Sequence, residues 1–280
     1  EPKGGSGGTG IVGTLTEFGS LIINGKRDLL DANTANSGPL GPLAEADLAI
    51  GQALTIEADA ETLLAARGFV ADPVIGRVFA VYPERRALWV DGVQVSLEAD
   101  AGPMPQIGDH VAVSGLWRGQ NVIASRLTPS PDGASALAGV FRRDASRLPR
   151  IGSARVLFPP SITEPADGTF VVVRGDYQSG AFFVKDIDRG RFIGAAGPLK
   201  NLSVEGYLDP VPQAPFFELA GLGHSFDDQA KLSAFEKERA LFEVPYTGNF
   251  AVAQAIVLPD TQAARREVLT QTAANAQSTR

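Results

Sequence analysis

The chain contains no cysteine, only one methionine, two histidines and two tryptophans. The lack of cysteine excludes disulfides, thiolate metal sites and thiol nucleophiles. No apolar run reaches the roughly 18 residues that a membrane-spanning helix needs, so we expect no transmembrane segment. The chain also lacks a nucleophile elbow, a phosphate loop, a dinucleotide fingerprint and a zincin motif. We therefore assign no catalytic residue, metal site or cofactor and expect a non-enzymatic protein.

Positive charge is in the minority and is unevenly placed. The net charge is −7, and the excess of acid is concentrated in residues 1–72 and 201–280. Residues 131–200 instead carry 10 basic and 7 acidic side chains. Nucleic-acid binding relies on neutralising phosphates, so the acidic total argues against a nucleic-acid partner. The basic excess in residues 131–200 leaves nucleic-acid binding open as a weaker alternative.

What the chain has in abundance is repetition. Residues 10–15 and 21–25 form a phrase that ends in Asn24-Gly25, and residues 74–78 and 88–93 repeat it with Asp91-Gly92. Asn-Gly and Asp-Gly between apolar runs are the favoured residues of tight hairpin turns. A period of about 60 residues indicates small β-modules in series.

Each repeated unit offers about five short strands, and so small a sheet must close or pair with a neighbour to remove its edges. We predict an all-β fold of three to four tandem, five-stranded, OB-like β-barrel modules. An SH3-like barrel and an extended sandwich remain alternatives, as do a rod and a compact cluster of modules. The predicted ranges are 9–72 (unit 1), 73–130 (unit 2), 137–200 (unit 3, diverged) and 202–259 (unit 4, diverged).

The two ends of the sequence differ from these units. Residues 1–8 are a Gly/Ser-rich flexible tether, and a tether without an initial Met suggests a processed, exported protein. One version is a lipoprotein with its lipid anchor just before Glu1, and the alternative is a trimmed chain. Residues 260–280 predict a tail that is helical over 262–272 and then disordered.

The opening phrase GTGIVGTLTEFGSLIING, residues 8–25, resembles a bacterial domain family of unknown function. That family continues with phrases like DLAIG and GDHVAVSG, which stand here at residues 47–51 and 108–115. The resemblance covers the first 130 residues, and the second half matches in outline. It implies exported, often lipid-anchored proteins built from OB-like modules. We therefore expect this protein in the periplasm or, as a lipoprotein, at the outer membrane or cell surface. The resemblance implies no activity.

A basic stretch at residues 141–150 is the best binding candidate. Arg142, Arg143 and Arg147 stand in it, and Phe141 and Tyr177 can supply stacking. OB-type barrels bind single strands through arginines and aromatics. In the alternative, the arginines pair with acids of another module or of a partner.

The two tryptophans are the second candidate. Trp117, beside Arg118, becomes an anchor for a partner or a sugar if it is exposed. In the favoured alternative, Trp89 and Trp117 both cover barrel ends.

Histidines and acids give weaker signals. His224 precedes a pair of aspartates. A histidine beside two carboxylates can bind a metal ion, and the alternative is a loop capped by an aspartate side chain. His110 stands in an alternating strand and is expected to face solvent. Asp186 and Asp188 can present two carboxylates on one strand face, but the frame of a calcium loop is missing.

Together these features predict a binding or scaffolding protein of the cell envelope, with a protein partner or a second copy of itself. An OB-type binder of single-stranded nucleic acid or oligosaccharide is the alternative. A shared groove of arginine and aromatic residues would favour the alternative, and a flat apolar face across modules would favour assembly.

Overall fold

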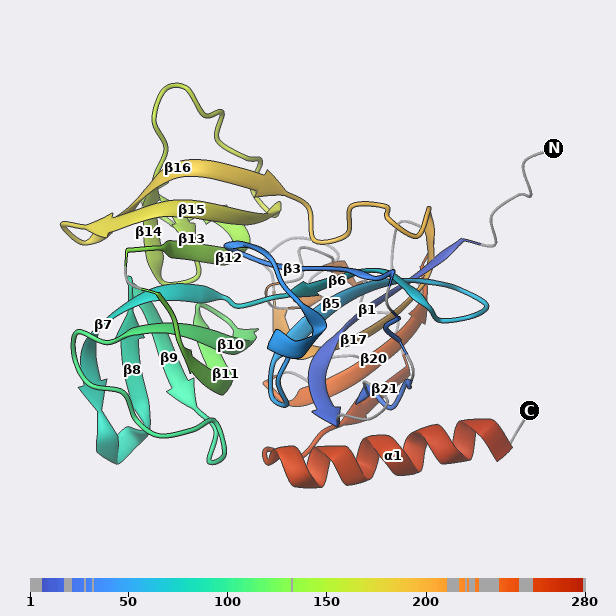
Figure 1. The fold of residues 1–280 in the computed structure, drawn as a ribbon. Coiled ribbons are helices and arrows are strands. Elements are labelled where there is room, and N and C mark those ends of the chain that lie inside the picture. The colour runs from blue at the N-terminus through green and yellow to red at the C-terminus, as the bar shows by residue number, and fades with distance from the viewer. Residues whose placement is uncertain are drawn as a thin grey trace.

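The protein is described here from a computed structural model, which describes residues 7–17, 22–27, 29–31, 33–131, 133–210, 217–219, 221, 225–226, 237–246 and 254–278. Strands make up the bulk of it, with one long helix near the C-terminal end (Figure 1). This confirms the all-β fold class. The expectation for His224 and the aspartates after it lies outside the described residues.

Unit 2 folds as a closed barrel of five strands. The first strand pairs with the second and the second with the third, the third runs parallel to the fifth, and the fourth closes the ring between the fifth and the first. This is a five-stranded Greek-key barrel of the OB type. The strands are β7 (Val74–Tyr82), β8 (Ala87–Val90), β9 (Val93–Leu97), β10 (His110–Arg118) and β11 (Asn121–Pro129), with the 3₁₀ turn η2 (Pro83–Arg85).

Unit 3 repeats that strand order and closes in the same way. Its fourth strand bulges at Gly175 as that of unit 2 does at Gly115, and a Cβ at either glycine would lie about 2 Å from a carbonyl oxygen of the fifth strand. The strands are β12 (Ser135–Arg143), β13 (Pro149–Ile151), β14 (Ala154–Leu157), β15 (Phe170–Gln178) and β16 (Ala181–Arg189).

Units 2 and 3 are joined through their first strands. β7 and β12 pair antiparallel, so the ten strands form one sheet. One hydrophobic cluster runs through both barrels and includes Val78, Val113, Phe141 and Val173, all fully buried. The two barrels therefore fold around a common core.

Unit 1 follows the same order but is open between its second and third strands in the part that the structure describes. Residues 57–67 contain no helix: they form the end of one strand, a turn and the start of the next. The strands are β1 (Gly8–Glu17), β2 (Ile22–Ile23), β3 (Ala35–Gly38), β4 (Gly41–Pro42), β5 (Ala53–Asp59) and β6 (Ala65–Val70), with the 3₁₀ turn η1 (Glu45–Asp47).

Unit 4 has the same order again, and its described third and fifth strands share no pairing. Its first strand lies parallel to β1, so units 1 and 4 share one 11-stranded sheet. The strands are β17 (Leu199–Pro210), β18 (Phe217–Leu219), β19 (Ser225–Phe226), β20 (Arg239–Pro245) and β21 (Gln254–Val257).

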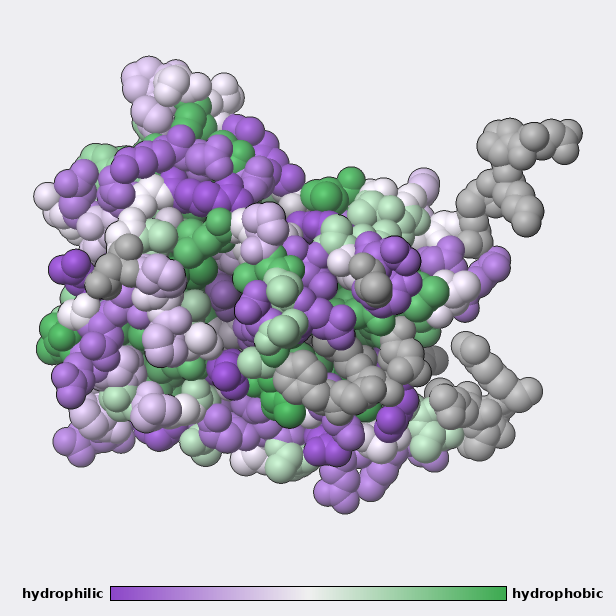
Figure 2. Space-filling model, in the orientation of Figure 1, coloured by the Kyte–Doolittle hydropathy of each residue, from purple (hydrophilic) through white to green (hydrophobic). Residues whose placement is uncertain are grey.

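The molecule is thus a compact cluster of two halves, with units 2 and 3 on one side and units 1 and 4 on the other (Figure 1). Hydrophobic residues gather along the line where the halves meet, and hydrophilic residues cover β15 and β16 (Figure 2).

Helix α1 (Gln262–Ser278) lies along the half formed by units 1 and 4 (Figure 1). Leu269 packs in a small cluster with Leu241 and Leu258. The helix predicted over 262–272 is present, and the disorder expected after it is wrong as far as Ser278. Among the described residues, no helix is long and apolar enough to cross a membrane.

Candidate functional site

Three of the five predicted binding residues meet at one place. Trp117, Arg142 and Arg143 line a pocket of about 140 Å³ where units 2, 3 and 4 come together, and Glu218 of unit 4 lines it too. Arg118 and Arg147 do not contribute to its walls. The structure therefore brings the tryptophan and two arginines of the basic stretch into contact with unit 4.

Trp117 is buried, with 4% of its surface exposed. Its indole Nε1 donates a hydrogen bond of 2.9 Å to the carbonyl oxygen of Ala138 in unit 3. A Cβ placed on Gly152 or Gly221 would overlap its ring, so the indole fills the space between units 3 and 4. The hypothesis that Trp117 is exposed and anchors a partner or a sugar is wrong, because its indole is packed between units.

The arginines of the basic stretch are paired with acids. Arg142 contacts the carboxylate of Glu218 in unit 4, and Arg143 contacts Glu164 and lies 2.8 Å from Asp167. Burial raises the pKa of Glu218, and the charge of Arg142 opposes that rise. The positive charge of the stretch is largely neutralised within the protein.

The remaining two candidates are exposed. Arg118 places its guanidinium 5.3 Å from the ring centroid of Tyr207 in unit 4. Arg147 adopts a left-handed backbone conformation, with φ of 63°. It lies in a turn in which its backbone N–H donates a hydrogen bond to the carbonyl oxygen of Asp144. Among the described residues Arg147 has no acidic partner.

The paired acids of β16 also have a structural role. Asp186 and Asp188 lie on one strand face, as expected, and hold the guanidinium of Arg174 at 2.6 and 2.7 Å. Arg174 Nε in turn donates to the carbonyl of Pro39 in unit 1. These two carboxylates therefore fasten unit 3 to unit 1.

Histidine and metal chemistry find little support among the described residues. We expected His110 to face solvent, but it is buried, and its Nδ1 has no hydrogen-bond partner among the residues that the structure describes. In the described part of the chain, no three His, Asp or Glu side chains are grouped to hold a metal ion.

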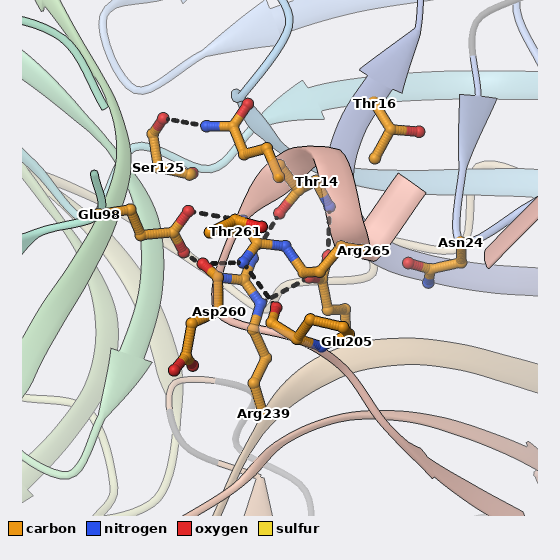
Figure 3. A network of polar contacts seen from close by, with 12 residues as sticks. Thr14, Thr16, Asn24, Glu98, Ser125, Glu205, Arg239, Asp260, Thr261 and Arg265 are labelled. Atoms are coloured by element: carbon orange, nitrogen blue, oxygen red, sulfur yellow. Dashed lines mark hydrogen bonds and ion pairs between the residues drawn. The ribbon is translucent and has the colours of Figure 1, made fainter. Parts of the chain in front are cut away.

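A network of four charges is buried where units 1, 2 and 4 meet helix α1 (Figure 3). Arg239 contacts Glu98 and lies 2.7 Å from Glu205, and Arg265 lies 2.5 Å from Glu98. Thr14 of β1 donates its backbone N–H to Glu205 at 2.7 Å. Two arginines and two glutamates balance, so this network binds the units together without requiring an outside ion.

The pKa shifts in this network follow from burial and from the arginines. Burial raises the pKa of Glu98, although Arg239 and Arg265 oppose the rise. Burial also acts to raise the pKa of Glu205, but there the two arginines prevail and the pKa is lowered.

An exposed aromatic surface was not identified from the sequence. Phe79 of β7 lies 6.1 Å from Trp89 of β8 and 6.2 Å from Tyr177 of β15, between ring centroids. Phe79 is 46% exposed, and the other two are half-buried. We call these three residues the aromatic surface. The alternation around Phe79 and Trp89 signals that both point outward, but Tyr177 joins them only through the docking of unit 3 on unit 2.

Polar side chains continue the aromatic surface along unit 2. Gln94 of β9 stands directly opposite Trp89 in the register, and Ser96 stands opposite Ala87, so both share the face of Trp89. Arg77, two residues before Phe79 on β7, is exposed and has no ion pair among the described residues. The face thus combines aromatic rings with an amide, a hydroxyl and the guanidinium of Arg77, whose charge also acts on Asp91.

Comparisons of this chain with protein families, with curated proteins and with solved structures find no match.

Proposed function

We propose that this protein is a non-enzymatic, exported binding protein whose aromatic surface holds an oligosaccharide of the bacterial envelope. The observation that carries the proposal is the meeting of Phe79, Trp89 and Tyr177 on one outer face, contributed by two barrels. Trp89 and Gln94 stand on the second and third strands of unit 2, which form the ligand-binding face of OB barrels. The placement in the envelope rests on the resemblance of the opening phrase.

The chemistry of this face favours a sugar chain over the other occupants. Sugars present apolar ring faces and hydroxyls, which match aromatic rings beside an amide and a hydroxyl. Nucleic acid requires a row of free cations, whereas Arg142 and Arg143 are acid-paired and the net charge is −7. A stable protein interface buries about 800 Å² per partner, more than three aromatic side chains supply.

The two tryptophans give a direct test of this proposal. Trp117 is buried and Trp89 is half-buried, so an added quencher such as acrylamide reaches mainly Trp89. We expect chitohexaose or solubilised peptidoglycan fragments to protect the fluorescence from quenching, with saturation as the glycan is titrated. The Trp89→Phe variant is expected to lose this signal.

A pair of variants on β7 supplies the matched control. Phe79 and Tyr82 are equally exposed at 46%, but only Phe79 contacts the other rings of the aromatic surface. Phe79→Ala should weaken glycan binding by about tenfold or more, and Tyr82→Ala by less than about twofold. The absence of protection by every glycan, or equal losses in the two variants, would overturn the proposal. Binding of oligo-dT instead would point to nucleic acid, and crosslinking to one abundant envelope protein would point to the scaffold predicted from the sequence.

A further inference from the structure

Arg191, in the segment between β16 and β17, is buried and has no acidic partner among the described residues. Its Nη1 donates to Thr55 Oγ1 at 2.9 Å and its Nη2 to the carbonyl of Gly221 at 2.8 Å. The guanidinium lies 4.3 Å from the ring centroid of Phe170, and only 8% of the residue is exposed. Its Nε is buried and has no hydrogen-bond partner in the described part of the chain. Arg191 thus joins units 1, 3 and 4, and its buried Nε–H is left unused.

The positive charge of Arg191 is not balanced by any acidic side chain that the structure describes. Among the described residues, the charge that acts on Arg191 is that of Arg67, which itself lies 3.4 Å from Glu57 and is also attracted by Asp188. The two oxygens of Glu57 also accept the backbone N–H groups of Ile193 and Ala195, both at 2.7 Å. Glu57 is thus engaged by Arg67 and by two backbone N–H groups, and no carboxylate of the described residues pairs with Arg191. The network of Glu98, Glu205, Arg239 and Arg265, by contrast, is neutral. A buried excess charge is costly unless a counter-charge is near.

Loss of the proton does not remove this excess at neutral pH. Burial, together with the charge of Arg67, lowers the pKa of Arg191 to about 9. The guanidinium is therefore still predominantly protonated at pH 7.

A small cavity adjoins Arg191 at the junction of the units. Its volume is about 20 Å³, and its walls are mainly apolar, with Ala53, Ala71, Leu116 and Ala138 among them. Glu205 also borders it, but the oxygens of Glu205 accept from Thr14 and Arg239. A space of this size takes a single water or monatomic ion. Carboxylates, phosphate and sulfate are too large.

We propose that this cavity is a chloride site, in which one halide ion balances Arg191 and accepts its unused Nε–H. This site is independent of the aromatic surface and of the glycan proposed there. Its effect is on stability, because the ion would bind the folded chain, where three units meet, and not the unfolded chain.

Halide-dependent unfolding of the full chain tests the site. In sodium gluconate, replacement of gluconate by chloride or bromide at constant ionic strength should raise Tm by about 2–4 °C and then saturate. The Arg191→Gln variant should show no halide dependence. Arg143→Gln, which alters an acid-paired surface arginine, should keep it.

Bromide diffraction keeps the test decisive if Arg191→Gln fails to fold. Crystals of the unaltered protein grown in sodium bromide should show an anomalous peak beside the Arg191 guanidinium. A Tm that is independent of halide, or bromide peaks only at other positions, would overturn the proposal.

Discussion

The indole of Trp117 occupies the space that a side chain on Gly152 would need. A Cβ at Gly152 would lie 2.0 Å from Cζ3 of the indole. Unit 3 makes the same contact in the other direction, because Tyr177 of unit 3 lies against Gly92 in the equivalent turn of unit 2. Both aromatics stand two residues after the bulge glycine of a fourth strand, Gly115 or Gly175. Units 2 and 3 therefore dock by exchanging the same contact.

Substitution of Gly152 should be costly for this reason. Gly152→Ala combines a left-handed φ of 56° with overlap of the indole, and should destabilise the protein by roughly 2–4 kcal/mol. Gly119→Ala is the matched control, since Gly119 has φ of 61° and nothing within 4 Å of its Cβ position. It should cost only about 1 kcal/mol. Urea unfolding measures both, and equal losses would show that Trp117 does not restrict position 152.

Arg265 should be the residue that fastens helix α1 to the barrels. Arg265→Met leaves Glu98 short of one partner in a buried network, and should cost about 3–5 kcal/mol. The adjacent Arg266 pairs with Glu17 at the surface, so Arg266→Met should cost less than about 1 kcal/mol. Urea unfolding gives the free energies, and hydrogen exchange over 262–278 should rise in the first variant alone. Unchanged exchange in Arg265→Met would contradict this assignment.

Asp72 should make stability depend on pH. It is buried at the link between units 1 and 2, where burial raises its pKa to about 6 although Ser114 donates a hydrogen bond to it. The folded chain holds this proton more tightly than the unfolded chain, so the contribution of Asp72 falls as pH rises from about 4 to about 6.

The Asp72→Asn variant isolates this effect. It should be more stable than the unaltered protein by roughly 2–3 kcal/mol at pH 7.5, and the difference should shrink towards pH 4. Urea unfolding at several pH values measures the difference. A difference that does not change with pH would show that Asp72 is not the titrating group.

The basic stretch should act in packing more than in binding. Arg142→Ala leaves Glu218 half-buried without its partner and should cost about 1–2 kcal/mol, whereas Arg147→Ala should cost less than about 0.5 kcal/mol. Urea unfolding separates the two. The triple Ala variant at 142, 143 and 147 should bind heparin no more weakly than the unaltered protein. A marked loss of heparin binding would restore the stretch as a ligand site.

Much of the local structure could be predicted from the sequence, because it depends on neighbours in the chain. Alternating apolar residues set the strands of unit 2. Asn24-Gly25 fixes a turn of unit 1 and Asp91-Gly92 a turn of unit 2, because these residues adopt a left-handed backbone conformation. The candidate binding residues were predicted less well. Trp117 and Arg142 do come together, but as packing and as an ion pair.

The contacts between units were decided only by the tertiary structure. The sequence by itself determined an all-β chain of short strands, since strand period and turn chemistry are written in consecutive residues. It did not determine that β1 pairs with β17, that Glu98 meets Arg265, or that Tyr177 joins Phe79 and Trp89. Those partners lie far apart along the chain, and an alternating pattern specifies which face of a strand is buried without specifying what covers it.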